Sequence, residues 1–306
     1  MTGSDAVNHE PPLLEIGEPL VRRLVDGQFP RWSRLPLTPF ASGGTDNAIF
    51  RLGDGLVARL PRRESAAPQA LREQTWLPRL ASHLPLPIPT PMAAGSPGEG
   101  YPWAWTICPW LEGDNAATAG VDDLCQAAAD LAAFLNAMGS IDATDGPAAG
   151  VENHGRGLSL RVLDRRVRTD IARLSGEIDG LAVLRVWDEA LAAPPWGRPG
   201  AWIHGDLHPG NLLVKAGRIA AVLDFGLMGV GDPACDLIIA WSLLEAASRE
   251  VFRQALRADA AMWARGRGWA VFNAVIALAF YLETNPELCA ISRRMLSEAL
   301  SCRSPR

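Results

Sequence analysis

The chain has 306 residues, enough for one large domain or for two lobes that each bury a core. Hydrophobic residues make up 48% of it and charged residues 21%, which is typical of a soluble globular protein and not of a disordered one. The net charge of −5 argues against nucleic acid as the main partner, because a nucleic-acid-binding surface is normally basic.

The N-terminus and the cysteines predict a cytoplasmic protein. Residues 1–12 lack the basic start and the apolar core of a signal peptide. The most apolar late stretch, residues 270–282, is too short to span a bilayer, so no membrane association is expected. The five cysteines are scattered without a close pair of metal-ligand spacing, which indicates reduced thiols. No obligate protein partner is evident.

The first third of the chain predicts a helix followed by an antiparallel sheet. Apolar residues at helical spacing indicate a helix over residues 13–28. Three strands follow between residues 35 and 60, and the segment 53–55, Gly-Asp-Gly, is a tight hairpin signal between the last two. Two further strands, expected around residues 90–95 and 103–109, complete a five-stranded sheet.

A glycine-rich loop, Ser42-Gly43-Gly44-Thr45, lies between the first two of these strands. Its glycines allow a ligand to approach the backbone closely, while Ser42 and Thr45 offer hydroxyl and N–H groups to phosphate oxygens. Glycine-rich hairpin tips are common and the string G-x-G-x-x-G is absent. The loop is therefore a candidate phosphate cover only together with motifs further along the chain.

A helix is predicted over residues 65–84, with Ser65 as its N-cap and Pro68 in its first turn. Pro78 should kink or end it. Glu73 lies on the same stripe as the leucines at 77 and 80, so its carboxylate should face inward. A buried carboxylate needs a cation, and Arg59 on the preceding strand is the obvious candidate.

The second half of the chain is mostly helical by its pattern. One long helix is expected over residues 123–138, and two more within residues 156–193. The last four predicted helices cover residues 234–247, 250–264, 268–284 and 287–300.

Residues 201–226, AWIHGDLHPGNLLVKAGRIAAVLDFG, place three polar residues between short apolar runs, a pattern of strand, polar loop, hairpin and second polar turn. Asp206 and Asn211 lie on one loop with a Pro-Gly turn, and Asp224 projects from the end of a buried strand. A carboxylate that can take a hydroxyl proton, with an amide and a second carboxylate that can hold Mg²⁺, is the minimal set for phosphoryl transfer.

The strings HGDLHPGN and LDFG resemble the catalytic-loop and metal-loop motifs of the aminoglycoside phosphotransferase family, relatives of the protein kinases. The resemblance implies an α+β, two-lobe protein-kinase-like fold. A five-stranded antiparallel N-lobe with one main helix would cover residues 1–112, and a mostly helical C-lobe residues 113–306. The family pattern is His-Gly-Asp where protein kinases have His-Arg-Asp, and this chain has Gly205 at the middle position. Control by a phosphorylated activation loop is therefore not expected.

The same resemblance implies transfer of phosphate from ATP, with GTP as a possible donor, to a hydroxyl group of a small molecule. The acceptor would be an antibiotic, an aminoglycoside or a related compound. Asp206 would orient the hydroxyl and accept its proton, and Asn211 and Asp224 would bind Mg²⁺. By resemblance Asp236 braces the catalytic loop. His204 is expected to pack or hydrogen-bond behind this loop and not to react.

Arg59 stands where protein kinases carry the lysine that grips the nucleotide phosphates, and the only lysine of this chain, Lys215, is elsewhere. Arginine keeps the charge and can bind phosphate with two parallel bonds. Its pairing with Glu73 would reproduce the family's phosphate-positioning ion pair. The alternative is that Arg59 is a solvated edge residue, with the arginines at 62 and 63 in its place.

The hinge between the lobes is also assigned by resemblance, to the main chain from Pro109 to Leu111. Because Pro109 lacks an N–H, its carbonyl would accept from adenine and the Leu111 N–H would donate.

Two alternatives to an antibiotic phosphotransferase stay open. One is a metabolic kinase on the same scaffold, acting on an amino alcohol, a sugar or homoserine, because the motifs define the phosphate donor and not the acceptor. The other is a nucleotide-binding protein without transfer activity, which the missing strand lysine favours and the intact Asp206, Asn211 and Asp224 oppose.

Overall fold

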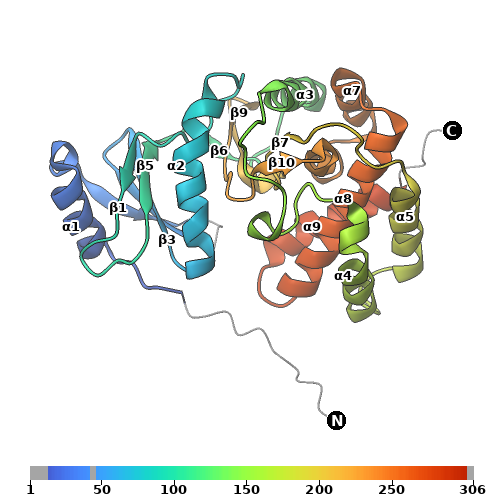
Figure 1. Ribbon diagram of the computed structural model, residues 1–306, viewed down its shortest axis with the longest axis horizontal. Helices are drawn as coiled ribbons and strands as arrows, with labels where there is room; N and C mark the ends of the chain where they lie inside the picture. The colour runs from blue at the N-terminus through green and yellow to red at the C-terminus, as the bar shows by residue number, and fades with distance from the viewer. Residues whose placement is uncertain (1–12, 42–45, 302–306) are drawn as a thin grey trace, which may run out of the picture. The chain divides into compact units, whose positions relative to one another are not determined.

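The computed structural model describes residues 13–41 and 46–301 (Figure 1). The described chain separates into two compact units. Residues up to 78 and residues 89–110 form the first, and residues 79–88 together with those from 111 onward form the second.

The first unit is built on a five-stranded antiparallel sheet with the strand order β1-β2-β3-β5-β4. The strands are β1 (Leu37–Phe40), β2 (Asn47–Leu52), β3 (Leu56–Pro61), β4 (Ala93–Gly95) and β5 (Trp105–Pro109). The predicted five-stranded sheet is therefore confirmed. The register of β2 and β3 closes on the tight turn that the Gly-Asp-Gly segment predicts.

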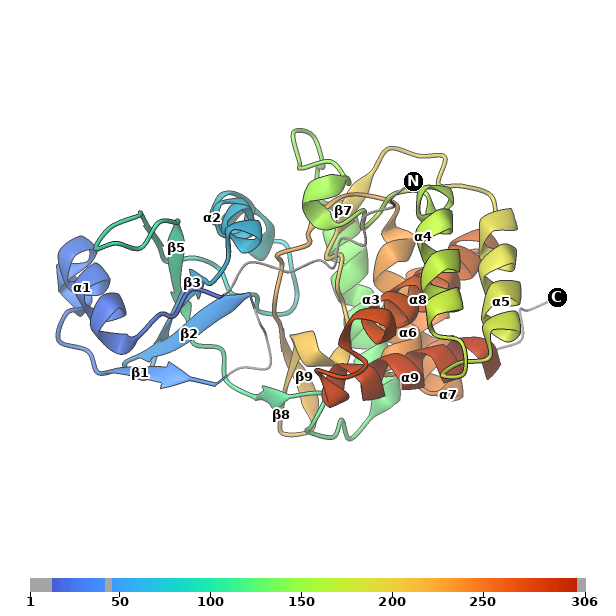
Figure 2. The same cartoon turned by 90° about the horizontal axis from the view of Figure 1, so that it is seen from below.

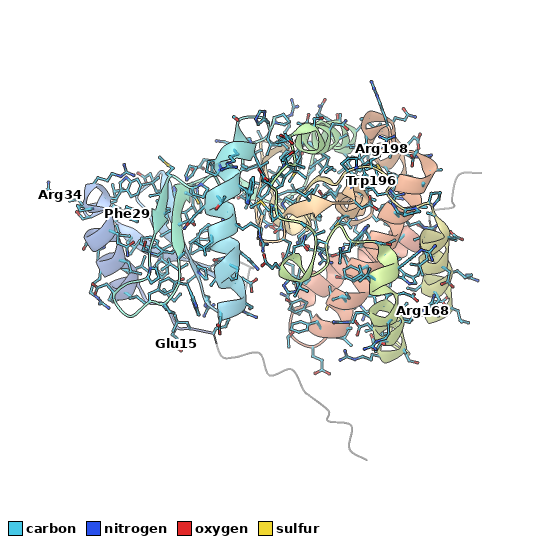
Figure 3. All side chains as sticks on the ribbon, in the orientation of Figure 1. Glu15, Phe29, Arg34, Arg168, Trp196 and Arg198 are labelled. Carbon is cyan, nitrogen blue, oxygen red and sulfur yellow. The ribbon has the colours of Figure 1, made fainter. Side chains whose placement is uncertain are left out.

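Helix α1 (Glu18–Gln28) packs its buried face, Val21, Leu24 and Val25, on this sheet. Phe29, labelled in Figure 3, lies just after the helix. Its ring contacts that of Trp105 of β5, with the centroids 5.4 Å apart. The helix starts five residues later than the predicted 13–28. The preceding segment is not helical, because the Leu14 N–H donates to the carbonyl of Arg62 at 2.8 Å instead.

Helix α2 (Ala67–Ala81) follows a short 3₁₀ turn, Glu64–Ala66. Ser65 lies within that turn, so the predicted N-cap at Ser65 is wrong. Pro68 is in the first turn of the helix, as predicted, where its missing N–H costs nothing. Pro78 does not end the helix, which continues to Ala81.

The second unit contains two small sheets. β6 (Asp114–Asn115), β8 (Leu212–Lys215) and β9 (Arg218–Val222) form one, and β7 (Ala201–Ile203) pairs with β10 (Gly229–Gly231) in the other. The predicted order of strand, polar loop and hairpin is confirmed for β7, β8 and β9. The strands β6 and β10 are too short to leave an alternating pattern in the sequence.

Helices make up most of the second unit, and α4, α5, α8 and α9 lie side by side in it (Figure 2). The helices are α3 (Leu124–Ser140), α4 (Leu160–Arg173), α5 (Gly180–Ala192), α6 (Ile239–Ser242), α7 (Ala246–Leu256), α8 (Ala260–Tyr281) and α9 (Pro286–Ser301). Across residues 13–41 and 46–301, none of the helices combines the length and the hydropathy that crossing a membrane requires.

The ends of the later helices differ from the prediction. The expected helix 234–247 is a 3₁₀ segment, Pro233–Ile238, followed by the single turn α6. The expected helix 250–264 ends at Leu256 because Arg257 adopts a left-handed conformation with φ 54°. The next helix begins at Ala260 instead of residue 268, since the Asp259 carboxylate caps it by accepting from the Met262 N–H.

A buried ion pair joins α8 to the 3₁₀ segment. Arg265 Nε donates to Asp232 Oδ2 at 2.7 Å, and both side chains are only 7% exposed. A second donor of Arg265, Nη1, bonds the Pro194 carbonyl at 2.7 Å. Asp232 also caps the 3₁₀ segment by accepting from the Ala234 N–H. The start of this segment is therefore held from α8.

We expect Arg265→Met to lower the free energy of unfolding by about 3–5 kcal/mol, because it leaves a buried carboxylate without its cation. The matched control is Arg293→Met, which removes the exposed pair with Glu177 and should cost about 0–1 kcal/mol. Urea unfolding followed by tryptophan fluorescence measures both. An equal loss of unfolding free energy in the two variants would show that the buried pair stabilises the protein no more than the exposed pair does.

Candidate active site

The catalytic loop, residues 204–211, connects β7 to β8 and is held at its start by one buried carboxylate. Asp236 Oδ2 accepts from the His204 N–H at 2.7 Å, and Oδ1 accepts from the Gly205 N–H at 2.8 Å. Asp236 is only 2% exposed. Burial raises the pKa of Asp236 above its usual value, although the two N–H groups that it accepts from lower it in part. The carboxylate lies where the predicted bracing role requires it.

Gly205 cannot carry a side chain in this loop. Its φ is +85°, and a Cβ at this position would lie 2.3 Å from the carbonyl oxygen of Leu227. Both the left-handed backbone and the close carbonyl require glycine. A larger residue here would shift the loop on which Asp206 sits.

His204 packs behind the loop, as predicted. Its ring is fully buried, with its centroid 4.6 Å from that of Phe225. The Asp206 N–H donates to Nδ1 at 3.1 Å, so Nε2 carries the proton and donates to the Leu223 carbonyl at 2.9 Å. The imidazole thus ties the catalytic loop to the end of β9.

Asp206 and Asn211 are brought together on the loop. Asn211 Nδ2 donates to the Asp206 carbonyl at 2.9 Å and to its Oδ2 at 3.3 Å. Asn211 is buried, and its amide oxygen takes no hydrogen bond from the described residues. This orientation leaves an oxygen, and not the NH₂ group, as the free end of the amide.

Asp224 follows β9 on an exposed turn with φ 59°, a left-handed conformation that aspartate tolerates better than most residues. Its neighbour Leu223 donates a backbone hydrogen bond to the Asn211 carbonyl at 2.8 Å, which holds the two loops together. An amide oxygen and a carboxylate are hard oxygen ligands of the kind Mg²⁺ prefers. The two side chains fit the predicted metal-binding role.

Two side chains with nitrogen groups, those of His208 and Arg156, flank the Asp206 carboxylate, which is 28% exposed. His208 Nε2 is 3.6 Å from Oδ2, and Arg156 Nη2 is 4.0 Å from Oδ1. Burial alone would raise the pKa of Asp206, but His208 and Arg156 together hold it below its usual value. Burial would lower the pKa of His208, but Asp206 and Asp224 raise it. Asp206 is therefore ionised at neutral pH.

Arg156 is the residue of this site that the sequence pattern did not reveal. It precedes α4 in a stretch that reads as alternating charged and apolar residues, typical of a solvated surface. The one available signal is its position between Gly155 and Gly157, both of which adopt positive φ. Paired glycines around an arginine indicate a constrained backbone and not a solvated helix face.

The first unit contains the predicted contact between β3 and α2. Arg59 Nη1 donates to Glu73 Oε2 at 2.8 Å and Nη2 to Oε1 at 3.3 Å, a fork of two parallel bonds. The side chains are 12% and 5% exposed, so Arg59 is not a solvated edge residue. The ion pair is confirmed, and its role in holding phosphate stays a prediction.

The candidate phosphate cover, Ser42 to Thr45, lies outside the described residues. The chain that follows it is fixed at Asp46, whose carbonyl accepts from the Arg62 N–H at 2.8 Å. Arg63 Nε lies 3.4 Å from the Asp46 carboxylate. Arg63 therefore contacts the residue that directly precedes β2.

The predicted hinge residues fall at the end of the first sheet and just after it. Pro109 is the last residue of β5 and pairs with Leu56 of β3. The Trp110 N–H donates to the Gly55 carbonyl at 2.9 Å, and Leu111 begins the second unit's main segment. The assignment of Pro109 and Leu111 to adenine binding stays a prediction.

The charge pairing at Asp206 predicts a measurable titration. Because the carboxylate raises the pKa of His208, Asp206→Asn should lower the pKa of that imidazole. Histidine-selective NMR across a pH series measures it. Asp54→Asn, which changes an exposed turn of the other unit, is the control and should leave the His208 titration in place. An unchanged His208 titration in Asp206→Asn would show that the two groups do not interact.

Comparisons with known proteins identify relatives of this chain. An aminoglycoside 3'-phosphotransferase from Escherichia coli is 27% identical over 115 residues, which are 38% of this chain and 42% of that protein. The chain thus aligns with well under half the length of this curated relative.

Two solved structures illustrate the fold. The GDP and kanamycin complex of the aminoglycoside phosphotransferase APH(2″)-IIIa matches with a TM-score of 0.71 and 18% identity, covering 92% of this chain and 98% of that one. The macrolide 2'-phosphotransferase of Brachybacterium faecium matches with a TM-score of 0.60 and 25% identity, covering 95% and 100%. The predicted kinase-like fold of the aminoglycoside phosphotransferases is therefore confirmed.

The sequence profile of the phosphotransferase enzyme family matches residues 37–269, a segment that includes β3, the catalytic loop and Asp224. Because this segment is most of the chain, the protein belongs to the phosphotransferase enzyme family.

Proposed function

We propose that the protein is an O-phosphotransferase that moves the terminal phosphate of ATP, or of GTP, to a hydroxyl group of an antibiotic, an aminoglycoside or a related compound. The observation that carries the proposal is the braced catalytic loop, on which Asp206 and Asn211 are hydrogen-bonded to each other and tied through Leu223 to the turn of Asp224. The family match supports it, as do relatives solved with GDP and kanamycin and with ATP and streptomycin.

In this function Asp206 orients the acceptor hydroxyl and accepts its proton as the new oxygen–phosphorus bond forms and the bond to the nucleoside diphosphate breaks. His208 and Arg156 lower the pKa of Asp206, so it is ionised and can accept a proton at neutral pH. Asn211 and Asp224 would hold Mg²⁺, which neutralises charge on the nucleotide phosphates when it is bound.

Nucleotide binding is assigned to the first unit and the segment that follows it. Arg59, held in place by Glu73, would contact the phosphates. The Pro109 carbonyl and the Leu111 N–H would hold the base. Ser42, Gly43, Gly44 and Thr45 would cover the phosphates. Solved relatives bind GDP, ADP or ATP, so the comparisons favour neither guanine nor adenine as the base.

We place the enzyme in the cytoplasm. Cys108, Cys235 and Cys289 are free and buried, and Cys125 is free and exposed, as suits a reducing compartment. The nucleotide that the reaction consumes is also available there.

The test of the proposal is an acceptor screen. Aminoglycosides, macrolides, cyclic peptide antibiotics and small metabolites are incubated with the enzyme, Mg²⁺ and either ATP or GTP, and release of ADP or GDP is measured. Mass spectrometry then identifies the phosphorylated product. We expect turnover with an antibiotic. Turnover with a metabolite alone would mean that the acceptor is a metabolite and not an antibiotic. Nucleotide binding without turnover on any acceptor would refute the transfer activity.

Asp206→Ala should lower turnover at least ~10²-fold, the lower end of what a general base contributes. Nucleotide affinity should stay within about threefold, because the phosphate contacts are assigned elsewhere. Asp122→Ala, which removes an exposed carboxylate of the same unit, is the control and should keep wild-type turnover. Near-wild-type turnover in Asp206→Ala would rule out its role.

Arg59→Met should weaken nucleotide binding roughly 10-fold or more, as expected for loss of a charge-assisted phosphate contact. It should also destabilise the first unit, because Glu73 is left buried without its cation. The double variant Arg59→Met/Glu73→Met separates the two effects, since it removes the unpaired charge. We expect it to recover stability in urea unfolding and not affinity in calorimetric nucleotide titration. Recovered affinity would mean that Arg59 has only a structural role.

A further inference from the structure

The segment that carries Arg156 is fixed on both sides. Asn153, which is buried, donates from Nδ2 to the Arg156 carbonyl at 2.9 Å. On the other side, the Gly157 carbonyl accepts from the Asp232 N–H at 2.8 Å. A Cβ on Gly157 would lie 2.6 Å from a side-chain carbon of Ile203, the last residue of β7. The backbone of Arg156 is therefore pressed against the strand that leads into the catalytic loop.

The guanidinium group of Arg156 lies on an aromatic surface. Its Cζ is 5.0 Å from the ring centroid of Phe272 on α8, and the side chain is 12% exposed. Phe272 is itself only 3% exposed and packs edge-on against Trp269. Packing and a cation–π contact thus restrict where this charge can be.

Asp206 is the one carboxylate within ion-pair distance of Arg156 among the described residues. Arg156 Nε is buried and makes no hydrogen bond within the described part of the chain. The 4.0 Å separation from Asp206 Oδ1 is longer than the 2.7–2.8 Å contacts of the structural pairs Arg265–Asp232 and Arg59–Glu73. Arg156 therefore interacts electrostatically with Asp206 but does not form a bidentate hydrogen-bonded pair with its carboxylate.

Phosphoryl transfer from a nucleotide to a hydroxyl brings two negatively charged groups close together. When the acceptor hydroxyl is hydrogen-bonded to Asp206, an anionic carboxylate and an anionic phosphoryl group approach the same oxygen atom. Their repulsion disfavours the reactive geometry. A cation beside the carboxylate that does not occupy its hydrogen-bonding sites offsets this repulsion and leaves an oxygen for the hydroxyl.

We propose that Arg156 is a positioning residue for phosphoryl transfer, whose guanidinium holds the Asp206 carboxylate in place beside the acceptor hydroxyl. This inference rests on the proposed function. It assigns to the loop before α4 a role in the reaction, although Arg156 lies 50 residues before Asp206 in the sequence.

The experiment compares Arg156→Met, which keeps an apolar chain over Phe272 without the charge, with Arg156→Lys, which keeps the charge. We expect kcat to fall roughly 10- to 100-fold in Arg156→Met, within the range that a misplaced catalytic group costs. KM for the acceptor and for the nucleotide should change less than about threefold. Lysine should recover part of kcat. Arg185→Met, an exposed arginine on α5, is the control and should match wild type.

A double-variant cycle separates positioning from folding. If Arg156 acts through Asp206, Arg156→Met should cause no further loss of turnover in an Asp206→Ala background. Additive losses would overturn the proposal, as would a wild-type kcat in Arg156→Met. If Arg156→Met does not fold, Arg156→Gln replaces it with the same expectations.

Nucleotide hydrolysis, with water as the acceptor, distinguishes failure of this inference from failure of the proposed function. If the wild type hydrolyses the nucleotide and Arg156→Met does so more slowly, the inference is supported even when no antibiotic acceptor is found. If Arg156→Met turns over as fast as the wild type, this inference is overturned and the proposed function is not. Absence of both hydrolysis and transfer in the wild type would overturn the proposed function and this inference together.

Discussion

The catalytic loop depends on the two hydrogen bonds that one buried carboxylate, Asp236, accepts from consecutive backbone N–H groups. A buried carboxylate is costly unless its oxygens are satisfied, so the loop and the carboxylate stabilise each other. Four residues earlier Asp232 caps the same 3₁₀ segment and is paired with Arg265 of α8. Asp232 also donates its N–H to Gly157, next to Arg156. A single buried segment thus connects α8, the loop before α4 and the catalytic loop, and a change in any of them should reach Asp206.

Gly205 shows why the loop has the sequence His-Gly-Asp. The N–H of Gly205 is used by Asp236, its φ is +85°, and the Leu227 carbonyl occupies the space of a side chain. An arginine at this position would have to displace Leu227, which follows directly on the turn that carries Asp224. The absence of the arginine that binds a phosphorylated activation loop is therefore a steric property of this site, and not only a difference in sequence. The loop is held by permanent contacts and needs no switch to order it.

Parts of the site could be predicted because the relevant residues are close in sequence or lie on regular elements. Asp206 and Asn211 share one short loop, and Glu73 lies on a helical stripe that faces the strand of Arg59. Arg156 could not be predicted this way. Its backbone follows a path through His154, Gly155 and Gly157, all with positive φ, and such a path leaves no periodicity. The predicted helix start at residue 268 is also wrong, because α8 is buried on nearly all sides and its apolar residues form no stripe.

Three of the four aspartates between residues 206 and 236 show how environment assigns different chemistry to one residue type. Asp236 is buried and both of its carboxylate oxygens accept hydrogen bonds from backbone N–H groups, so its role is structural. Asp224 is exposed at a turn, where its carboxylate can meet a cation. Asp206 lies between these extremes, partly exposed and flanked by Arg156 and His208, which keep it charged while leaving it accessible. A proton acceptor needs both properties, because a fully buried carboxylate would be out of reach and an isolated one would not be held in place. Arg156 and His208 therefore belong to the candidate site together with Asp206, Asn211 and Asp224.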